Sequence, residues 1–188
     1  MQTYTFTVVD IFSILTIIGQ FCAFLLVILF FFRESKLHRW ISQYGLQLML
    51  IVAVLATGGS LFFSEIAEWV PCKDCWLQRI FMYPQVLLLA LALWKKDRGI
   101  ALYILALCLI GAGIAIDHYA DQAMAALFPI PDAEGVNMLL KPCDASGVSC
   151  AKTEIRFAYG YITLPMMALT AFILNGLGSL FLLRTKKA

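Results

Sequence analysis

The sequence has few charged residues and lacks the motifs of soluble cofactor-dependent enzymes. Only 14% of its 188 residues are charged, whereas 62% are hydrophobic, and the mean hydropathy is +0.85. A composition this apolar excludes an ordinary soluble globular domain. The net charge of +2 gives no sign of a nucleic-acid surface. No haem motif, dinucleotide-binding glycine fingerprint or nucleotide-binding loop is present. We therefore expect lipid to surround most of the chain.

Five apolar stretches are long enough to cross a bilayer. At about 1.5 Å per residue they extend roughly 25 to 37 Å, compared with a hydrocarbon core of about 30 Å. The five stretches are residues 11–32, 41–64, 76–94, 100–116 and 159–183. A cleaved signal peptide is the alternative for the first, but it requires a basic N-terminal region, and residues 1–10 contain neither Lys nor Arg. The sequence predicts an all-α integral membrane protein with five transmembrane helices.

The basic residues predict how these helices are oriented, because Lys and Arg are retained on the cytoplasmic side of a membrane. Nine of the 14 basic residues lie in alternate connections, namely Arg33, Lys36, Arg39, Lys95, Lys96, Arg98, Arg184, Lys186 and Lys187. We therefore predict an external N-terminus, a cytoplasmic C-terminus and two external loops, residues 65–75 and 117–157. Both loops are net acidic. Residues 120–128 in the second loop have an apolar helical face. A short interfacial helix and an irregular loop are both compatible with this segment.

The predicted topology places four of the six cysteines outside. Cys72 and Cys75 form a Cys-x-x-Cys motif before the third helix, and Cys143 and Cys150 lie late in the second loop. The two cysteines inside predicted helices, where a thiol packs as a small apolar residue, are Cys22 and Cys108. Paired thiols in an oxidising compartment serve redox exchange or structural bracing. Because a Cys-x-x-Cys ring removes little entropy from the unfolded chain, we favour exchange.

The residues that follow the Cys-x-x-Cys motif predict a ligand site. Arg79 lies one helical turn beyond Cys75, inside a predicted membrane helix, where a charged side chain usually marks a ligand site or pathway. Extension of Arg79 to the lipid headgroups is the alternative. Gln78 and Trp76 are candidates for a hydrogen bond and an aromatic wall at the same ligand, or are interfacial residues.

Exchange between the two pairs requires an electron acceptor. An exposed disulfide of Cys143 and Cys150, which flank a turn sequence, is suited to accept electrons from a soluble dithiol protein and pass them to the first pair. Ordinary dithiols have potentials of about −270 to −180 mV and a strongly oxidising partner about −120 mV, so unaided transfer is about 3 to 7 kcal/mol uphill. With no cofactor motif in the chain, we expect a lipid-soluble quinone as the oxidant.

Two segments resemble the DsbB family of disulfide-generating quinone reductases, and most closely its BdbC-type members. One is Pro-Cys-Lys-Asp-Cys-Trp-Leu-Gln-Arg at residues 71–79, and the other runs from residue 141 to residue 167. The resemblance spans about residues 41–183 and implies a four-helix transmembrane bundle. It divides the chain into residues 1–40, with an extra N-terminal helix and a cytoplasmic loop, and a DsbB-like membrane domain at residues 41–188. It also implies a bacterial plasma membrane.

The resemblance implies a role for each external cysteine. Cys143 forms the mixed disulfide with a DsbA-like thioredoxin-fold dithiol oxidase, and Cys150 exchanges with Cys72. Cys75 faces a ubiquinone or menaquinone near Arg79.

The resemblance further implies a place for His118 beside the quinone. By its sequence alone, a histidine at the outer end of the fourth helix, such as His118, is more often an interfacial residue than a relay.

Three other functions compete with a quinone-linked disulfide-forming enzyme. A vitamin K epoxide reductase-like enzyme also joins two cysteine pairs on a helix bundle, but its loop pair precedes the Cys-x-x-Cys. Zinc held by four external cysteines would make the chain a non-enzymatic scaffold, although the Cys-x6-Cys spacing suits zinc poorly. An importer that reduces external thiols would carry its reactive cysteines within the membrane. We predict no metal, and the four external cysteines leave three disulfide pairings open.

Overall fold

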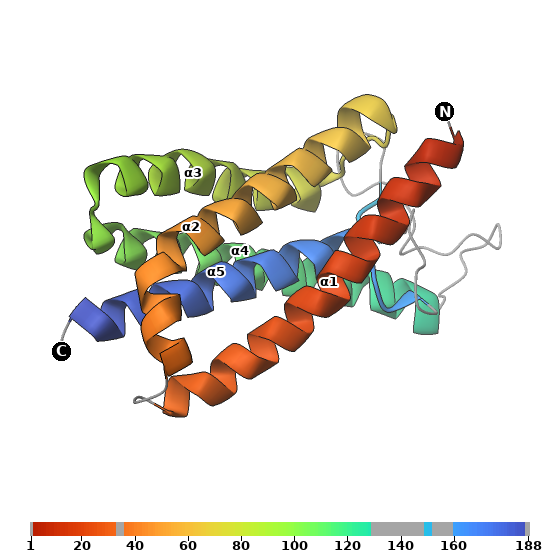
Figure 1. Ribbon diagram of the computed structural model, residues 1–188. Helices are drawn as coiled ribbons and strands as arrows, with labels where there is room; N and C mark the ends of the chain where they lie inside the picture. Colours follow the sequence, from red (N-terminus) through yellow and green to blue (C-terminus); the bar gives the residue numbers. More distant parts are fainter. Residues whose placement is uncertain (1, 33–35, 129–148, 152–159, 187–188) are drawn as a thin grey trace, which may run out of the picture.

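The computed structural model describes residues 2–32, 36–128, 149–151 and 160–186 (Figure 1). The described helices are α1 (Gln2–Phe31), α2 (Lys36–Leu61), the π-helical turn η1 (Phe62–Ile66), α3 (Lys73–Lys95), the 3-10 turn η2 (Arg98–Ile100), α4 (Ala101–Leu127) and α5 (Leu164–Lys186). Within these described residues, five spans are long and apolar enough to cross a membrane, one on each α-helix. The prediction of an all-α protein with five transmembrane helices is confirmed.

Helix α4 extends further than the sequence predicted. Its apolar run ends at Ile116, but the helix continues without a break to Leu127, so residues 120–127 are its last turns rather than a separate interfacial helix. Alanine, glutamine and methionine favour helix there, and no helix breaker occurs before Pro129. His118 and Gln122, one turn apart, are both buried in this extension. The extension therefore carries polar side chains inside the bundle.

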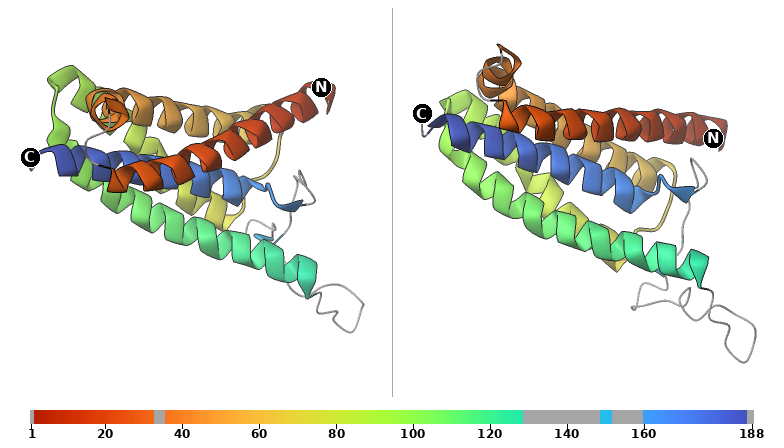
Figure 2. Two further views of the ribbon diagram at one scale, coloured as in Figure 1. Left: turned by 60° about the horizontal axis from the view of Figure 1, so that its bottom comes forward. Right: turned by 90° about the horizontal axis from the view of Figure 1, so that it is seen from below.

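Helix α5 is the element on which the others assemble. It packs against α1, α2 and α4, while α3 lies against α2 and α4 (Figures 1 and 2). Close approach of α4 and α5 depends on Gly111, since a Cβ atom there would lie 2.3 Å from the Phe172 ring. A small residue allows such contact where lipid gives no hydrophobic drive for helices to associate. Pro165 falls in the first turn of α5, where its missing N–H breaks no helical hydrogen bond.

A small polar cluster joins three helices in the middle of the bundle. The Asn175 amide of α5 donates to Oε1 of Gln85 in α3 at 2.9 Å, and the Cys108 thiol of α4 points to the same oxygen at 3.6 Å. Gln85 and Asn175 are fully buried. Cys108 is packed as predicted, with this weak hydrogen bond added, whereas Cys22 is exposed on the bundle surface. Bonds of this kind fasten helices together where there is no water to satisfy polar groups.

Candidate active site

The Cys-x-x-Cys motif forms the start of α3. Cys72 is the N-cap, with an extended backbone (φ −72°, ψ 175°), and Cys75 is the third helical residue. The Cys72 carbonyl accepts the Trp76 N–H at 3.2 Å, and the Cys72 thiol donates a hydrogen bond to the Cys75 sulfur, 3.3 Å away. The helix N-terminus presents partial positive charge to the Cys75 sulfur, which favours thiolate character there.

The proton of this dithiol is held by Cys72. Its hydrogen bond to Cys75, together with burial, raises the pKa of Cys72 from 9.0 to about 12, while the nearby His118 acts in the opposite direction. Cys72 is therefore the protonated donor at neutral pH, and the Cys75 sulfur is the acceptor. This asymmetry gives the two sulfurs different chemical tasks.

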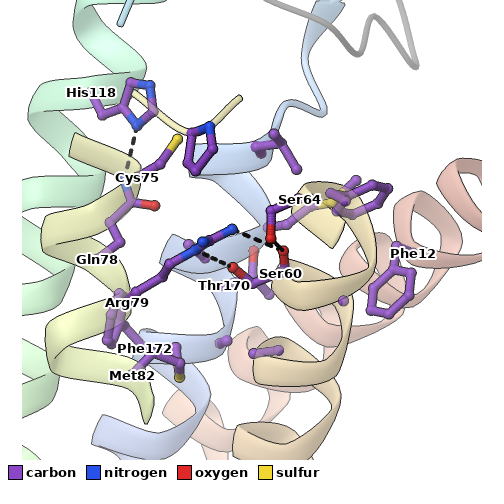
Figure 3. A pocket seen from close by; sticks show the side chains of 18 of the residues that line it. Phe12, Ser60, Ser64, Cys75, Gln78, Arg79, Met82, His118, Thr170 and Phe172 are labelled. Carbon is purple, nitrogen blue, oxygen red and sulfur yellow. Dashed lines mark hydrogen bonds between the residues drawn. The ribbon is translucent and has the colours of Figure 1, made fainter. Parts of the chain in front are cut away.

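His118 connects the cysteine pair with α3 and with the second predicted loop. Its Nε2 lies 3.6 Å from Cys72 Sγ and 3.1 Å from the Cys150 carbonyl oxygen, and its Nδ1 lies 3.0 Å from Nε2 of Gln78 (Figure 3). A carbonyl oxygen only accepts, so Nε2 carries the proton and Nδ1 accepts from the Gln78 amide. The side chain is 1% exposed. Its N–H thus points at Cys150 and at the Cys72 sulfur, where it stabilises negative charge.

Arg79 is turned into the bundle rather than outward. It is 9% exposed, and its Nε and Nη2 donate to the Ser60 hydroxyl at 2.9 Å and the Ser60 carbonyl at 3.0 Å (Figure 3). The Tyr83 hydroxyl also donates to Ser60 Oγ at 3.3 Å. The third guanidinium nitrogen, Nη1, has no hydrogen-bond acceptor within the described part of the chain. The arginine is thus fixed by two bonds with one donor group left available.

Ser60 was not predicted as part of the site. It closes a Gly-Gly-Ser run in α2, and such small residues usually indicate helix packing. Just beyond it, η1 shifts the helical pairing to i+5, as in the bond from the Ala67 N–H to the Phe62 carbonyl. Turns of this type often occur at functional sites, so η1 is the local feature that points to Ser60 as a site residue.

An apolar cavity of about 260 Å³ opens beside these residues. Cys72, Cys75, Gln78, Arg79 and His118 all line it, so the structure brings five of the eight predicted site residues to one place. The rest of the lining is mainly apolar and comes from α1, α2, η1, α5, the connection before α3, further residues of α3 and α4, and Ser149.

Three predicted residues have other positions. Trp76 is 56% exposed and does not line the cavity. Its ring contacts Arg79 instead, with the guanidinium carbon 5.0 Å from the ring centroid. The aromatic lining comes instead from other side chains, namely Phe12, Phe63, Trp69, Tyr83 and Phe172. Cys150 is buried, and its carbonyl bonds His118. Cys143 lies outside the described residues.

The site also contains three potential metal ligands. The ligand atoms of Cys72, Cys75 and His118 lie within 4.8 Å of one another. Both nitrogens of His118, however, take part in hydrogen bonds, Nε2 as a donor and Nδ1 as an acceptor. In this arrangement the imidazole offers no lone pair to a zinc ion, so the geometry suits thiol chemistry better than a structural metal.

Comparison with known proteins agrees with this chemistry. Residues 42–182 match the family model described as disulfide bond formation protein DsbB. The chain belongs to the DsbB family. It is 44% identical over 124 residues to disulfide bond formation protein C of Bacillus subtilis, covering 66% of this chain and 81% of that protein. It is 38% identical over 158 residues to the probable disulfide formation protein C of Bacillus cereus, covering 82% and 99%. No solved structure gives a significant match.

Membership of this family establishes the coarse function. The chain is a multi-pass membrane thiol oxidoreductase that forms disulfides, as the predicted fold and chemistry required. The region matched by the family covers α3 and α4 entirely and most of α2 and α5, so it includes the whole Cys72–His118–Arg79 site. Helix α1 lies before it.

Proposed function

We propose that this DsbB-family member oxidises an extracytoplasmic thioredoxin-fold dithiol oxidase and delivers the electrons to a membrane quinone through Cys72 and Cys75. The main support is the position of this pair at the polar end of an apolar cavity, beside Arg79 and His118. We place the N-terminus outside a bacterial plasma membrane and the C-terminus in the cytoplasm. Residues 1–40 form an addition to the DsbB-like domain at residues 41–188.

The cavity fits a quinone in both shape and chemistry. Its wall is largely apolar, which suits a quinone ring and its isoprenoid tail, and its few polar groups converge at one end, as in most small-molecule sites. Nη1 of Arg79 is the donor available to a quinone oxygen, and Gln78 orients His118 at the same end. Trp76 stacks under the guanidinium and supports it from outside. A bound quinone supplies a two-electron acceptor that takes up two protons on reduction.

The residues of the chain would act in sequence. The partner's dithiol is oxidised by the Cys143–Cys150 disulfide, with Cys143 forming the mixed disulfide. The resulting dithiol reduces the Cys72–Cys75 disulfide, with Cys150 attacking Cys72. The nearness of the Cys150 backbone to His118, which in turn lies 3.6 Å from Cys72 Sγ, supports this second exchange. The reduced pair, with Cys72 as thiol and Cys75 as thiolate, then loses two electrons and the Cys72 proton and becomes a disulfide again; the other proton has already left when Cys75 became a thiolate.

Each buried group has a task in the last step. Cys75, as hydrogen-bond acceptor at the helix N-terminus, is the sulfur that carries negative charge. Cys72 holds the proton until the new S–S bond forms. The N–H of His118 stabilises charge on Cys72 during exchange, and Arg79 keeps positive charge beside the acceptor site. Water is excluded by the aromatic and aliphatic lining.

Steady-state oxidation of a DsbA-like dithiol protein by the purified enzyme and a quinone tests this proposal. We expect one quinol formed for each partner disulfide, no turnover in Cys143→Ser, and unchanged rates in the control Cys22→Ser, which alters an exposed cysteine remote from the cavity. Wild-type rates in Cys143→Ser would contradict the relay. Stoichiometric zinc in the active enzyme would also contradict it, because bound thiolates would be unable to cycle.

A further inference from the structure

Helix α1 lies outside the matched family region and still forms part of the cavity. Phe12, Leu15 and Thr16 line it, facing α2 and α5 (Figure 3 shows Phe12). The rest of α1 exposes many large apolar side chains, as expected for a helix in contact with lipid. A helix that served only to anchor the chain would have no need of a face in this cavity.

Helix α1 is held in a defined position against α5. The Gln20 amide donates to Thr170 Oγ1 at 3.4 Å and accepts from the Tyr161 hydroxyl at 3.1 Å. One residue earlier, Gly19 allows close contact, since a Cβ atom there would lie 3.0 Å from the Thr170 methyl. At the far end, Arg184 bonds the Phe30 carbonyl and stacks on the Phe30 ring. These contacts fix the rotation of α1, and with it the face turned to the cavity.

Phe12 joins α1 to the aromatic part of the cavity lining. Its ring packs edge-on against Phe63, 5.8 Å between centroids, and Phe63 stacks on Trp69 at 5.1 Å. The ring occupies the space above Gly59 of α2, where a Cβ atom would lie only 2.6 Å away. Glycine at this position is therefore required for Phe12 to reach the cavity.

Leu15 and Thr16 lie along the apolar half of the cavity; the Thr16 side chain is buried, and the Leu15 side chain is 42% exposed. Two contacts show the depth of α1 in the bundle. Phe12 lies at the height of Gly59 on α2, and Gly19 lies at the height of Leu174 on α5, because a Cβ atom at Gly19 would lie 3.2 Å from the Leu174 side chain. Leu15 and Thr16 fall between these two levels. The Thr16 hydroxyl donates to the Phe12 carbonyl of its own helix at 2.7 Å, so its hydrogen is not available to a ligand.

The cavity is longer than the ring of a quinone requires. Its lining on α2 and η1 extends from Val52 to Phe63, a rise of about 16 Å along these continuous helical turns. The polar residues Cys75, Arg79 and His118 are at one end, and the other end is lined by Val52, Leu55 and Leu174. An extended apolar chain attached to a polar ring matches this distribution.

We propose that α1 forms the wall that binds the isoprenoid tail of the quinone, and that Leu15 and Thr16 determine which tails are accepted. This inference rests on the proposed quinone site and assigns a specificity role to a helix outside the family's matched region. Enlarging either side chain would obstruct the tail without disturbing the ring beside Arg79.

The test compares a tailed quinone, menaquinone-4, with its tail-less analogue menadione. The variants are Leu15→Phe and Thr16→Phe, with Ile18→Phe as the matched control because Ile18 is 52% exposed and lies outside the cavity. We expect KM for menaquinone-4 to rise about tenfold in both variants, with kcat and all menadione constants unchanged. Binding of menaquinone-4 to the oxidised enzyme, in which no turnover occurs, should weaken by the same factor when measured by extraction of retained quinone.

Photo-crosslinking provides a measurement that does not depend on overpacking. We expect Leu15→p-benzoylphenylalanine to crosslink labelled menaquinone-4 strongly, and the same change at Ile14, which does not line the cavity, to crosslink it only weakly. Equal crosslinking at the two positions, or equal effects of the Phe variants on both quinones, would overturn the role of α1. If the wild-type enzyme reduced neither quinone, the proposed function itself would fail, so the two failures are distinguishable.

Discussion

Two groups of buried polar side chains occupy α3, α4 and their neighbours, and they differ in what surrounds them. Cys108 and Asn175 both donate to Oε1 of Gln85, and all three residues lie outside the cavity. The second group, around Cys75 and Arg79, lines the cavity and retains an available donor. In a membrane, burial of a polar side chain is thus no sign of chemistry by itself. The reactive cluster differs from the helix-fastening cluster because its polar groups face a cavity.

The largest difference between the clusters should appear when a cysteine is removed from each. Cys75→Ser removes the sulfur that carries charge and should reduce turnover to the background rate. Cys108→Ala removes only a weak 3.6 Å bond to Gln85 and should leave the rate within about twofold of the wild type. Rates are measured as quinol formation with a dithiol partner. Comparable losses in the two variants would remove the distinction between the clusters.

The next largest effect should come from the charge beside the cavity. Arg79→Ala removes the donor available to a quinone oxygen, and a hydrogen bond from a charged group contributes about 1.5–3 kcal/mol. We expect KM for quinone to rise about tenfold or more. The control Arg98→Ala lies in η2 at the opposite end of α3 and should leave KM unchanged. An unaltered KM in Arg79→Ala would assign this arginine to helix fastening through Ser60 instead.

The hydrogen bond between the two sulfurs is open to titration. Since this bond is the largest cause of the raised pKa of Cys72, Cys75→Ala should lower that pKa from about 12 toward 9.0, so the Cys72 thiolate should form at lower pH. The ultraviolet absorbance of the thiolate as a function of pH measures this. Loss of the His118 N–H in His118→Ala should shift the pKa in the opposite direction. A Cys72 pKa unchanged by both substitutions would contradict the assignment of the proton to Cys72.

The smallest effect should be found in the fastening cluster. Asn175→Ala removes the 2.9 Å bond to Gln85, and side-chain hydrogen bonds between membrane helices contribute about 0.6 kcal/mol on average, up to about 1.7. We expect the free energy of unfolding in detergent to fall by about 1 kcal/mol while KM for quinone stays constant. A rise in KM without loss of stability would instead connect this cluster to the cavity.

Local patterns in the sequence predicted the helices and much of the site. Hydropathy located the five helices, and the Cys-x-x-Cys motif with Arg79 one turn later predicted a ligand site, because both signals lie within a few residues of one another. The end of α4 was missed because hydropathy falls at Asp117 while helix propensity does not. Ser60 was missed because its partner Arg79 is 19 residues away and meets it only through the packing of α2 on α3.

The part played by α1 was equally invisible before the fold was known. Nothing in the spacing of Phe12, Leu15 and Thr16 distinguishes them from the lipid-facing residues beside them. Their position is set by Gly19 and Gln20 packing on α5, contacts across about 150 residues of sequence. Tertiary contacts of this length determine the rotation of a helix that is apolar on every side.

A single-turnover experiment tests the central claim most directly. The variant with both Cys143→Ser and Cys150→Ser, reduced at Cys72 and Cys75 and freed of reductant, is mixed with quinone in the absence of oxygen. We predict one quinol per protein molecule, together with a disulfide between Cys72 and Cys75 in the non-reduced peptide map. Absence of quinol, or quinol formed while these two thiols remain reduced, would contradict the account.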